Sequence, residues 1–241
     1  LGDVYKRQNL KNEIDINKFN YEKYSVVQDL KELEDWKKNI DEKGYVAVDT
    51  ETDSLNAIEA NLIGFSLATD INNACYIPLK HDDSRKQINF EDAISILKSI
   101  AEDKSVTKIF HNKKYDALVL DKYGIKVNSY EDTMLISYSL GSGGTRHSLD
   151  NLAKNYLSHS ALSYKDIVGT GKNQKSFNEI DIYEATRYAA EDADITFRLW
   201  KLLKPRLALE KTSSVYESIE RPLASIIMNM EKNGVCIDES I

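Results

Sequence analysis

The stretch that decides the fold is Tyr45–Asp49, with the sequence Tyr-Val-Ala-Val-Asp, followed directly by Thr50 and Glu51. Its mixture of β-branched and aromatic residues is typical of a buried strand. Two further β-rich runs follow at 62–68 and 74–79, with turn residues between them. We therefore expect the three runs to form an antiparallel meander.

Helical patterns flank this meander. Apolar residues recur at helical spacing between Leu30 and Ile40 and predict a helix over 28–43, which Gly44 ends. A second apolar stripe from Phe90 to Ile100 predicts another helix, after which 106–110 returns as a strand. Beyond residue 111 the pattern is helical almost throughout. Strands first, helices afterwards and one strand–helix–strand crossover predict a mixed-sheet α/β domain.

Composition narrows the functional classes. The chain has 241 residues, and its 32 basic and 39 acidic residues give a net charge of 32 − 39 = −7. This balance argues against a surface that coats duplex nucleic acid, but not against a nuclease whose carboxylates bind divalent cations. Cys75 and Cys236 have no metal-type spacing and indicate neither a disulfide framework nor a zinc site. No apolar run of about 18 residues and no secretion signal is visible, so we expect a cytoplasmic protein without a membrane partner.

The end of the decisive strand carries two carboxylates. Asp49 and Glu51 are two residues apart, and the period of a strand points both to the same side of the sheet. Two like charges in one small volume are unfavourable unless a cation lies between them or one is protonated. An isolated Asp-x-Glu can also be a polar strand end whose acids face water.

A third acid lies on the core-facing stripe of a helix predicted over 182–203. Asp192 falls among the apolar residues of this helix, with Tyr188 one turn before it. Because an isolated buried charge is costly, Asp192 must be paired, protonated or metal-bound. On the same helical wheel, Glu191, Asp194 and Arg198 fall on the opposite face, and we expect them to be ordinary surface residues.

Asp116 is the fourth acid of interest. It follows the 106–110 strand at the head of a predicted helix, where it could also be an acid near a positive helix end. Four acids without a clustered His or Cys favour the hard cations Mg²⁺ or Mn²⁺. Two such ions about 3.5 to 4 Å apart promote phosphodiester hydrolysis, and Tyr188 could hold the attacking water.

Several other polar residues have two interpretations each. His111 lacks a Ser or Cys partner and is better explained as a hydrogen-bonded structural histidine than as a nucleophile or base. A second group could contact phosphate or could equally belong to solvated loops: Arg146, His147, Lys165, Lys172 and Lys175.

Three motifs together resemble the 3′–5′ proofreading exonuclease domain of bacterial family A DNA polymerases. They are Asp-Thr-Glu-Thr-Asp-Ser-Leu at 49–55, Asn-Lys-Lys-Tyr-Asp at 112–116 and Tyr-Ala-Ala-Glu-Asp-Ala-Asp at 188–194. Supporting stretches at 132–135 and 171–174 extend the resemblance over roughly 24 to 238. Their order and spacing make the resemblance specific.

The resemblance implies a ribonuclease H-like α/β fold, in which a mixed sheet of meander and parallel strands is flanked by helices. It implies the DEDDy class, with two Mg²⁺ or Mn²⁺ ions held by four acids and Tyr188 positioning water. It also implies that Leu55 wedges against the terminal base and that Tyr164 stacks on single-stranded DNA. The residues transferred are, as metal ligands, Asp49, Glu51, Asp116 and Asp192, and, as substrate contacts, Leu55 and Tyr164. Asn112, Lys114 and Arg146 are further candidate substrate contacts.

On this basis the chain is interpreted as a fragment. We expect an N-terminal extension over 1–23, of which 1–8 is interpreted as non-native, an exonuclease domain over 24–212 and the start of a covalently attached polymerase domain over 213–241. We expect a monomer, associated with the nucleoid, that acts on single-stranded DNA 3′ ends. Two alternatives stay open: an RNA exonuclease similar to ribonuclease D, and a non-catalytic domain that holds DNA or acts as a spacer.

Overall fold

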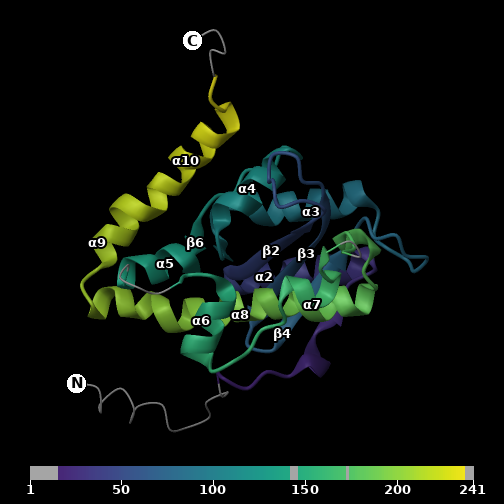
Figure 1. The fold of residues 1–241 in the computed structure, drawn as a ribbon, viewed down its shortest axis with the longest axis horizontal. Helices are drawn as coiled ribbons and strands as arrows, with labels where there is room; N and C mark the ends of the chain where they lie inside the picture. Colours follow the sequence, from purple (N-terminus) through teal and green to yellow (C-terminus); the bar gives the residue numbers. More distant parts are fainter. Residues whose placement is uncertain (1–15, 142–145, 172–173, 237–241) are drawn as a thin grey trace.

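The computed structural model describes residues 16–141, 146–171 and 174–236 (Figure 1). The 1–8 stretch, Lys172 and most of the expected 141–145 loop lie outside the described residues, as does the end of the 24–238 resemblance. No helix in the described part of the chain has both the length and the apolarity that crossing a bilayer requires.

A mixed sheet forms the centre of the domain, with the strand order β1-β4-β3-β2-β5-β6. The strands β2, β3 and β4 are antiparallel neighbours, as the sequence predicts, whereas β1, β5 and β6 pair in parallel. The two outer strands were not predicted, because two or three residues are too few to show an alternating pattern. The bounds are β1 Ser25–Val26, β2 Tyr45–Thr52, β3 Leu62–Asp70, β4 Asn73–Pro78, β5 Thr107–Phe110 and β6 Tyr130–Asp132.

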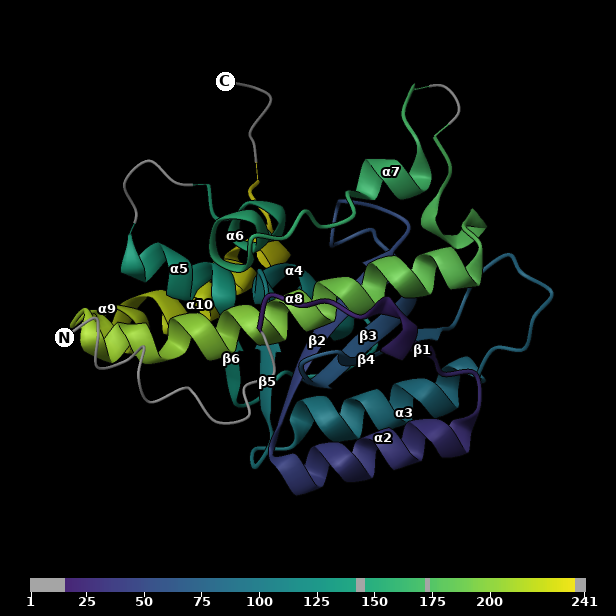
Figure 2. The same ribbon diagram turned by 90° about the horizontal axis from the view of Figure 1, so that it is seen from below.

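Helices cover both faces of the sheet, as Figure 2 shows: α2 and α3 lie on one side and the long α8 crosses the other. The α-helices are α2 Leu30–Lys43, α3 Phe90–Glu102, α4 Lys113–Asp121, α5 Thr133–Leu140, α6 Leu149–Leu157, α7 Tyr164–Val168, α8 Ile182–Leu209, α9 Ser213–Val215 and α10 Arg221–Asn233. Shorter helical turns are η1 Tyr21–Lys23, η3 Phe177–Glu179 and the π-helical η4 Tyr216–Glu220. The mixed-sheet α/β prediction is confirmed.

Local signals explain where α2 and β2 meet. The side chain of Asp29 accepts a hydrogen bond from the Lys31 amide and begins α2. Gly44 ends the helix in the left-handed region, with φ of 74°, which a side chain would disfavour. The chain therefore turns directly into β2, which carries the first two acids.

Helix α8 is longer than predicted. It continues through Pro205 to Leu209. Pro205 lies on an exposed side of the helix, where the carbonyl of Lys201, which loses its helical partner, can be hydrated.

The prediction of a solvated face on α8 around residue 194 is wrong. Glu191, Asp194 and Arg198 are each 0% exposed. The segment 16–24 covers them, since the Tyr21 hydroxyl donates to Glu191 at 2.6 Å and the Tyr24 hydroxyl donates to Asp194 at 2.7 Å. At this point α8 is buried on both sides, so its polar residues are paired rather than hydrated.

The last described segment packs against the rest of the chain. Tyr216, in η4, is buried and donates to Glu131 of β6 at 2.7 Å. Helix α10 lies against α4, where Lys114 forms an ion pair with Glu231. The domain boundary at 212/213 stays a prediction.

Candidate active site

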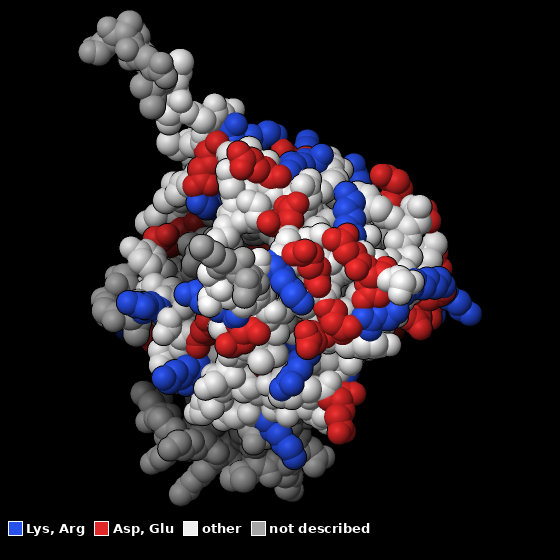
Figure 3. All heavy atoms as spheres, turned by 45° about the vertical axis from the view of Figure 1, so that its right-hand side comes forward, with Lys and Arg blue, Asp and Glu red and all other residues white. Residues whose placement is uncertain are grey.

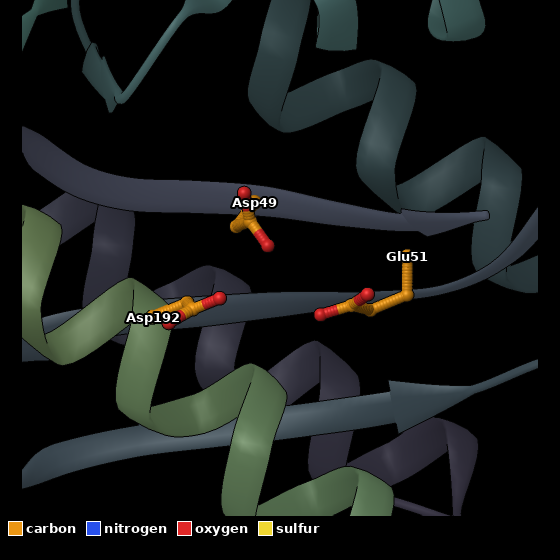
Figure 4. Close-up of side chains that lie close together, drawn as sticks. All are labelled: Asp49, Glu51 and Asp192. Carbon is orange, nitrogen blue, oxygen red and sulfur yellow. The ribbon is translucent and has the colours of Figure 1, made fainter. Parts of the chain in front are cut away.

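Three of the four predicted acids converge at the end of β2. Asp49 and Glu51 project from β2 toward α8, which contributes Asp192 (Figure 4). Carboxylate oxygens of the three residues all lie within 4.8 Å of one another. The prediction that Asp49 and Glu51 share one side of the sheet agrees with this geometry.

Asp116, the fourth acid, lies near the head of α4. It lines one pocket together with Asp49, Glu51 and Asp192, although it is not part of the group of three. It is 2% exposed and accepts two hydrogen bonds from Thr50, from the amide at 3.1 Å and from the hydroxyl at 2.7 Å. Thr50 thereby ties the head of α4 to β2. The role of Thr50 depends on this long-range pairing, which no local sequence pattern reveals.

The acids line a pocket of about 220 Å³. Of the predicted substrate contacts, Leu55, Asn112 and Tyr164 also line it. The complete lining is Asp49, Thr50, Glu51, Thr52, Ser54, Leu55, His111, Asn112, Tyr115, Asp116, Tyr164, Tyr188 and Asp192.

The electrostatics of this pocket favour a cation. Burial raises the pKa of Asp49 to about 7. Burial also raises the pKa values of Glu51, Asp116 and Asp192, and repulsion from neighbouring acids, Asp49 above all, raises them further. The Oε1 atom of Glu51 is buried without a hydrogen-bond partner among the described residues. Oxygen ligands around an unsatisfied carboxylate fit a hard divalent cation.

Tyr188 lies one turn before Asp192 on α8 and lines the pocket with it. Burial, followed by the negative charge of Asp192, raises its pKa well above the ordinary tyrosine value. A hydrogen bond from Tyr188 in turn lowers the pKa of Asp192. Its hydroxyl therefore stays protonated at neutral pH and can donate or accept a hydrogen bond, but it is a poor base.

Gly64 of β3 pairs with Glu51 of β2, and Tyr76 of β4 packs closely against Gly64. A Cβ atom at position 64 would lie 2.2 Å from the Tyr76 hydroxyl. Tyr76 is fully buried, and its hydroxyl lies 2.8 Å from Nε2 of His81. Close approach of the Tyr76 ring therefore requires glycine at position 64.

The side of the pocket is built by the 53–58 loop and an aromatic group. The Tyr115 hydroxyl donates to the Ser54 carbonyl at 2.6 Å and so anchors the loop that carries Leu55, which is 87% exposed. The Tyr164 ring lies 6.3 Å from the Tyr188 ring and is stacked on Phe177. Tyr115 falls inside the second motif, but no local sequence pattern indicates this anchoring contact.

The remaining predicted contacts lie elsewhere. Lys114 lines a neighbouring pocket with Leu55 and Glu231, and Arg146 is exposed outside the acid-lined pocket. His111 lines the pocket, and its Nδ1 lies 2.8 Å from the Thr133 hydroxyl, while burial lowers its pKa to about 4. This hydrogen bond agrees with the structural interpretation of His111.

The other candidate phosphate contacts lie outside the pocket. His147 lies 3.0 Å from the Ser137 hydroxyl. Lys165 and Lys175 are exposed. On the face shown in Figure 3, acidic and basic side chains of the described residues are interspersed, without one dominant sign.

The sequence matches a known family. A family model described as 3′–5′ exonuclease matches residues 24–208. DNA polymerase I of Rhizobium leguminosarum is 43% identical over 242 residues, which covers 92% of this chain and 24% of the relative. DNA polymerase I of Pseudomonas aeruginosa is 37% identical over 224 residues, covering 90% of this chain and 24% of the relative. The chain thus spans about a quarter of the length of these relatives.

Solved structures share the fold. The POL domain of Pol1 from M. smegmatis, in complex with DNA primer-template and dNTP, superposes with a TM-score of 0.69 at 20% identity, covering 88% of this chain and 33% of that one. Brucella melitensis NrnC superposes with a TM-score of 0.64 at 22% identity, covering 90% of this chain and 93% of that one. A structure of the same protein with bound Mg²⁺ gives 0.61 at 22% identity, covering 91% and 96%. The predicted ribonuclease H-like fold is confirmed.

The acid cluster and the family together indicate an enzyme site for divalent cations. The family model covers most of the chain, and the sequence relatives are DNA polymerases I. This chain belongs to the 3′–5′ exonuclease family of DNA polymerase I.

Proposed function

We propose that this domain hydrolyses the terminal phosphodiester of a single-stranded or frayed DNA 3′ end with two divalent cations, Mg²⁺ or Mn²⁺. Asp49, Glu51, Asp116 and Asp192 would hold the cations. The observation that supports this most is the convergence of buried carboxylates, with an unsatisfied oxygen on Glu51, in one pocket. Such a cluster costs folding free energy unless cations neutralise it.

The chain's own residues would orient the reactants. Bound cations of this kind polarise a phosphodiester and lower the pKa of water. The Tyr188 hydroxyl, held beside Asp192, would orient the attacking water toward the terminal phosphorus. The phosphorus gains an oxygen from water and loses the 3′ oxygen of the preceding nucleotide, which releases a nucleoside monophosphate. Leu55 would wedge against the terminal base, while Tyr164 would stack on the single-stranded DNA without sequence preference.

Substrate selection would depend on strand separation. A pocket of about 220 Å³ favours one unpaired terminal nucleotide over a duplex end. Mispaired ends unstack at lower cost and would therefore enter more often, which is proofreading. The remaining contacts proposed are Asn112, Lys114 and Arg146. The ribonuclease D-like alternative shares the acids, but the sequence relatives named DNA polymerase I favour DNA.

The cellular setting is part of the proposal. We place this domain in a larger bacterial DNA polymerase I, with 213–241 opening a covalently attached polymerase domain. It would act there as a monomer in the nucleoid of the cytoplasm. The length of the sequence relatives, of which this chain covers 24%, supports the larger parent protein.

The test is turnover of end-labelled oligonucleotides by the full chain. We expect stepwise release of deoxynucleoside monophosphates from single-stranded DNA with Mg²⁺ or Mn²⁺, slower release from matched duplex, and none with EDTA. Faster hydrolysis of an RNA of the same sequence would favour the ribonuclease alternative. Absence of turnover, together with absence of Mn²⁺ binding by calorimetry, would favour the non-catalytic spacer.

A further inference from the structure

Glu191 is a fully buried acid, next in sequence to Asp192, for which the proposed reaction has no use. Both of its carboxylate oxygens are occupied. Oε1 lies 2.6 Å from the Tyr21 hydroxyl and 2.7 Å from Nε2 of His159, and Oε2 accepts the amide of Leu162 at 2.8 Å. The acid thus ties α8 to two segments distant in the sequence.

One of these segments leads directly to the pocket. His159 and Leu162 lie in the stretch between α6 and α7, and Tyr164 is the first residue of α7. Ser163 caps the N-terminus of α7, because its side chain accepts from the Asp166 amide while Asp166 accepts from the Ser163 amide. The Leu162 bond to Glu191 therefore fixes the chain two residues before the ring that lines the pocket.

The other segment covers this arrangement. The Phe19 ring is stacked on His159, with centroids 3.6 Å apart, and the Arg198 guanidinium lies 3.8 Å from the Phe19 ring centroid. Tyr21 adds its hydroxyl to the same Glu191 oxygen that binds His159. Residues 16–24 therefore shield the Glu191 contacts from water, which strengthens the hydrogen bonds they enclose.

We propose that Glu191 is a positioning residue: through His159 and the Leu162 amide it fixes the entry to α7, so that Tyr164 faces the acid-lined pocket. The inference rests on the proposed function and deepens it, because it assigns part of the affinity for single-stranded DNA to the contacts of Glu191 with His159 and the Leu162 amide. Glu191 touches neither the terminal phosphate nor the cations in this role. Its effect therefore belongs to substrate affinity rather than to the chemical step.

The chain offers a matched control at Asp194, which is equally buried on the same helix. Asp194 accepts from the Tyr24 hydroxyl at 2.7 Å, the Asn72 amide at 3.1 Å and Arg198 at 2.9 Å. These contacts come from Tyr24, the residue after η1, from Asn72 in the β3–β4 turn and from α8 itself, and none of them is made by α7 or by the stretch before it. Loss of Asp194 contacts should therefore change stability without changing the position of Tyr164.

The experiment compares E191Q with D194N in the full chain. Binding of a fluorescent single-stranded oligonucleotide is measured by anisotropy in EDTA, and KM and kcat are measured with Mn²⁺. We expect E191Q to raise Kd and KM about tenfold, the order expected when one base loses its stacking partner, with kcat within about threefold. D194N should lower Tm while Kd and KM stay within about twofold of wild type.

A double-mutant cycle with Tyr164→Ala tests the route of the effect. In that background E191Q should raise Kd by less than about twofold, because the ring it positions is gone. If E191Q or D194N fails to fold, Tyr21→Phe and Tyr24→Phe are the gentler pair, and only Tyr21→Phe should weaken oligonucleotide binding.

Three results would overturn the proposal: wild-type affinity in E191Q, equal loss of affinity in D194N, or full additivity with Tyr164→Ala. The two proposals fail separately. A wild-type chain that binds the oligonucleotide but hydrolyses no 3′ end contradicts the proposed function and leaves the binding comparison decisive. A wild-type chain that does not bind the oligonucleotide contradicts both.

Discussion

Helix α8 carries three neighbouring buried acids, Glu191, Asp192 and Asp194, whose surroundings are opposite in kind. Asp192 faces Asp49 and Glu51, and no ion pair reaches these three among the described residues. Glu191 and Asp194, on either side of it, each have three donors within hydrogen-bond distance. Asp49, Glu51 and Asp192 lack a cationic partner among the described residues, whereas Glu191 and Asp194 are paired with donors from the protein itself.

This difference distinguishes acids that form a ligand site from acids that stabilise the fold. A buried carboxylate that already has partners holds segments together, and its loss leaves those partners unpaired. A buried carboxylate that faces other carboxylates is held by the fold despite repulsion, so a cation stabilises it. Burial alone does not distinguish the two sets; the partners do.

The strongest contrast should come from Asp192→Ala against wild type. We expect kcat on single-stranded DNA with Mg²⁺ to fall about 10³-fold or more, because a bound metal contributes several kcal/mol of transition-state stabilisation and about 1.4 kcal/mol is tenfold. Without metal, Tm should be unchanged or higher, since repulsion with Asp49 and Glu51 is relieved. A mutant that degrades the strand as fast as wild type would contradict the assignment.

Asp194→Ala should have the opposite outcome. Arg198, which is 0% exposed, would lose its charged partner, and removing one member of a buried pair costs about 3–5 kcal/mol. Urea unfolding measures this loss. The folded fraction, assayed well below its Tm, should keep kcat within about threefold of wild type. Unchanged stability would mean that Arg198 finds another partner.

Cation binding should stabilise the folded chain only through Asp49, Glu51 and Asp192. At about 100 times its Kd, Mn²⁺ should raise the free energy of unfolding of wild type by about 2.7 kcal/mol. The gain should disappear in Asp192→Ala. It should persist in Glu131→Gln. Glu131 is a buried acid that does not line the pocket, and it forms an ion pair with Lys204 at 2.8 Å. Equal stabilisation of all three proteins would place the cation elsewhere.

The smallest effect concerns pH in EDTA. The pKa of Asp49 is raised to about 7 in the folded chain, above its ordinary value of 3.8, so the folded state binds more protons between these values. The resulting stabilisation is fully present below about pH 4 and is lost as pH rises through about 7. Thermal melts of wild type should show this loss relative to Asp49→Asn. Saturating Mn²⁺ should reverse the trend, because cations compete with protons.

Much of the site could be predicted from local pattern. The two-residue period of β2 placed Asp49 and Glu51 together, and the helical wheel identified Asp192 as an acid among apolar residues. The packing of β2 against α8 depends on tertiary structure, which local pattern does not reveal. Only the resemblance of the three motifs predicts that their acids converge.

The missed features share a physical cause. Glu191 and Asp194 resembled surface acids because a helical wheel assumes one solvated face, whereas the 16–24 segment buries the second face of α8. Their donors Tyr21 and Tyr24 are each 170 residues away in the sequence. No periodicity can reveal such partners. Likewise, β1 and β6 depend on neighbouring strands rather than on their own composition.

Gly64 imposes a constraint that reaches beyond its own strand. Even the smallest added side chain would collide with the Tyr76 hydroxyl at 2.2 Å and with the Ile77 carbonyl at 2.7 Å. The backbone of Ile77 lies in the adjacent strand and cannot rotate away as a side chain can. Glu51 is the β2 partner of Gly64. An alanine at 64 would thus push β3 away from β4 and shift the paired Glu51, a proposed cation ligand, although residue 64 itself does not line the pocket.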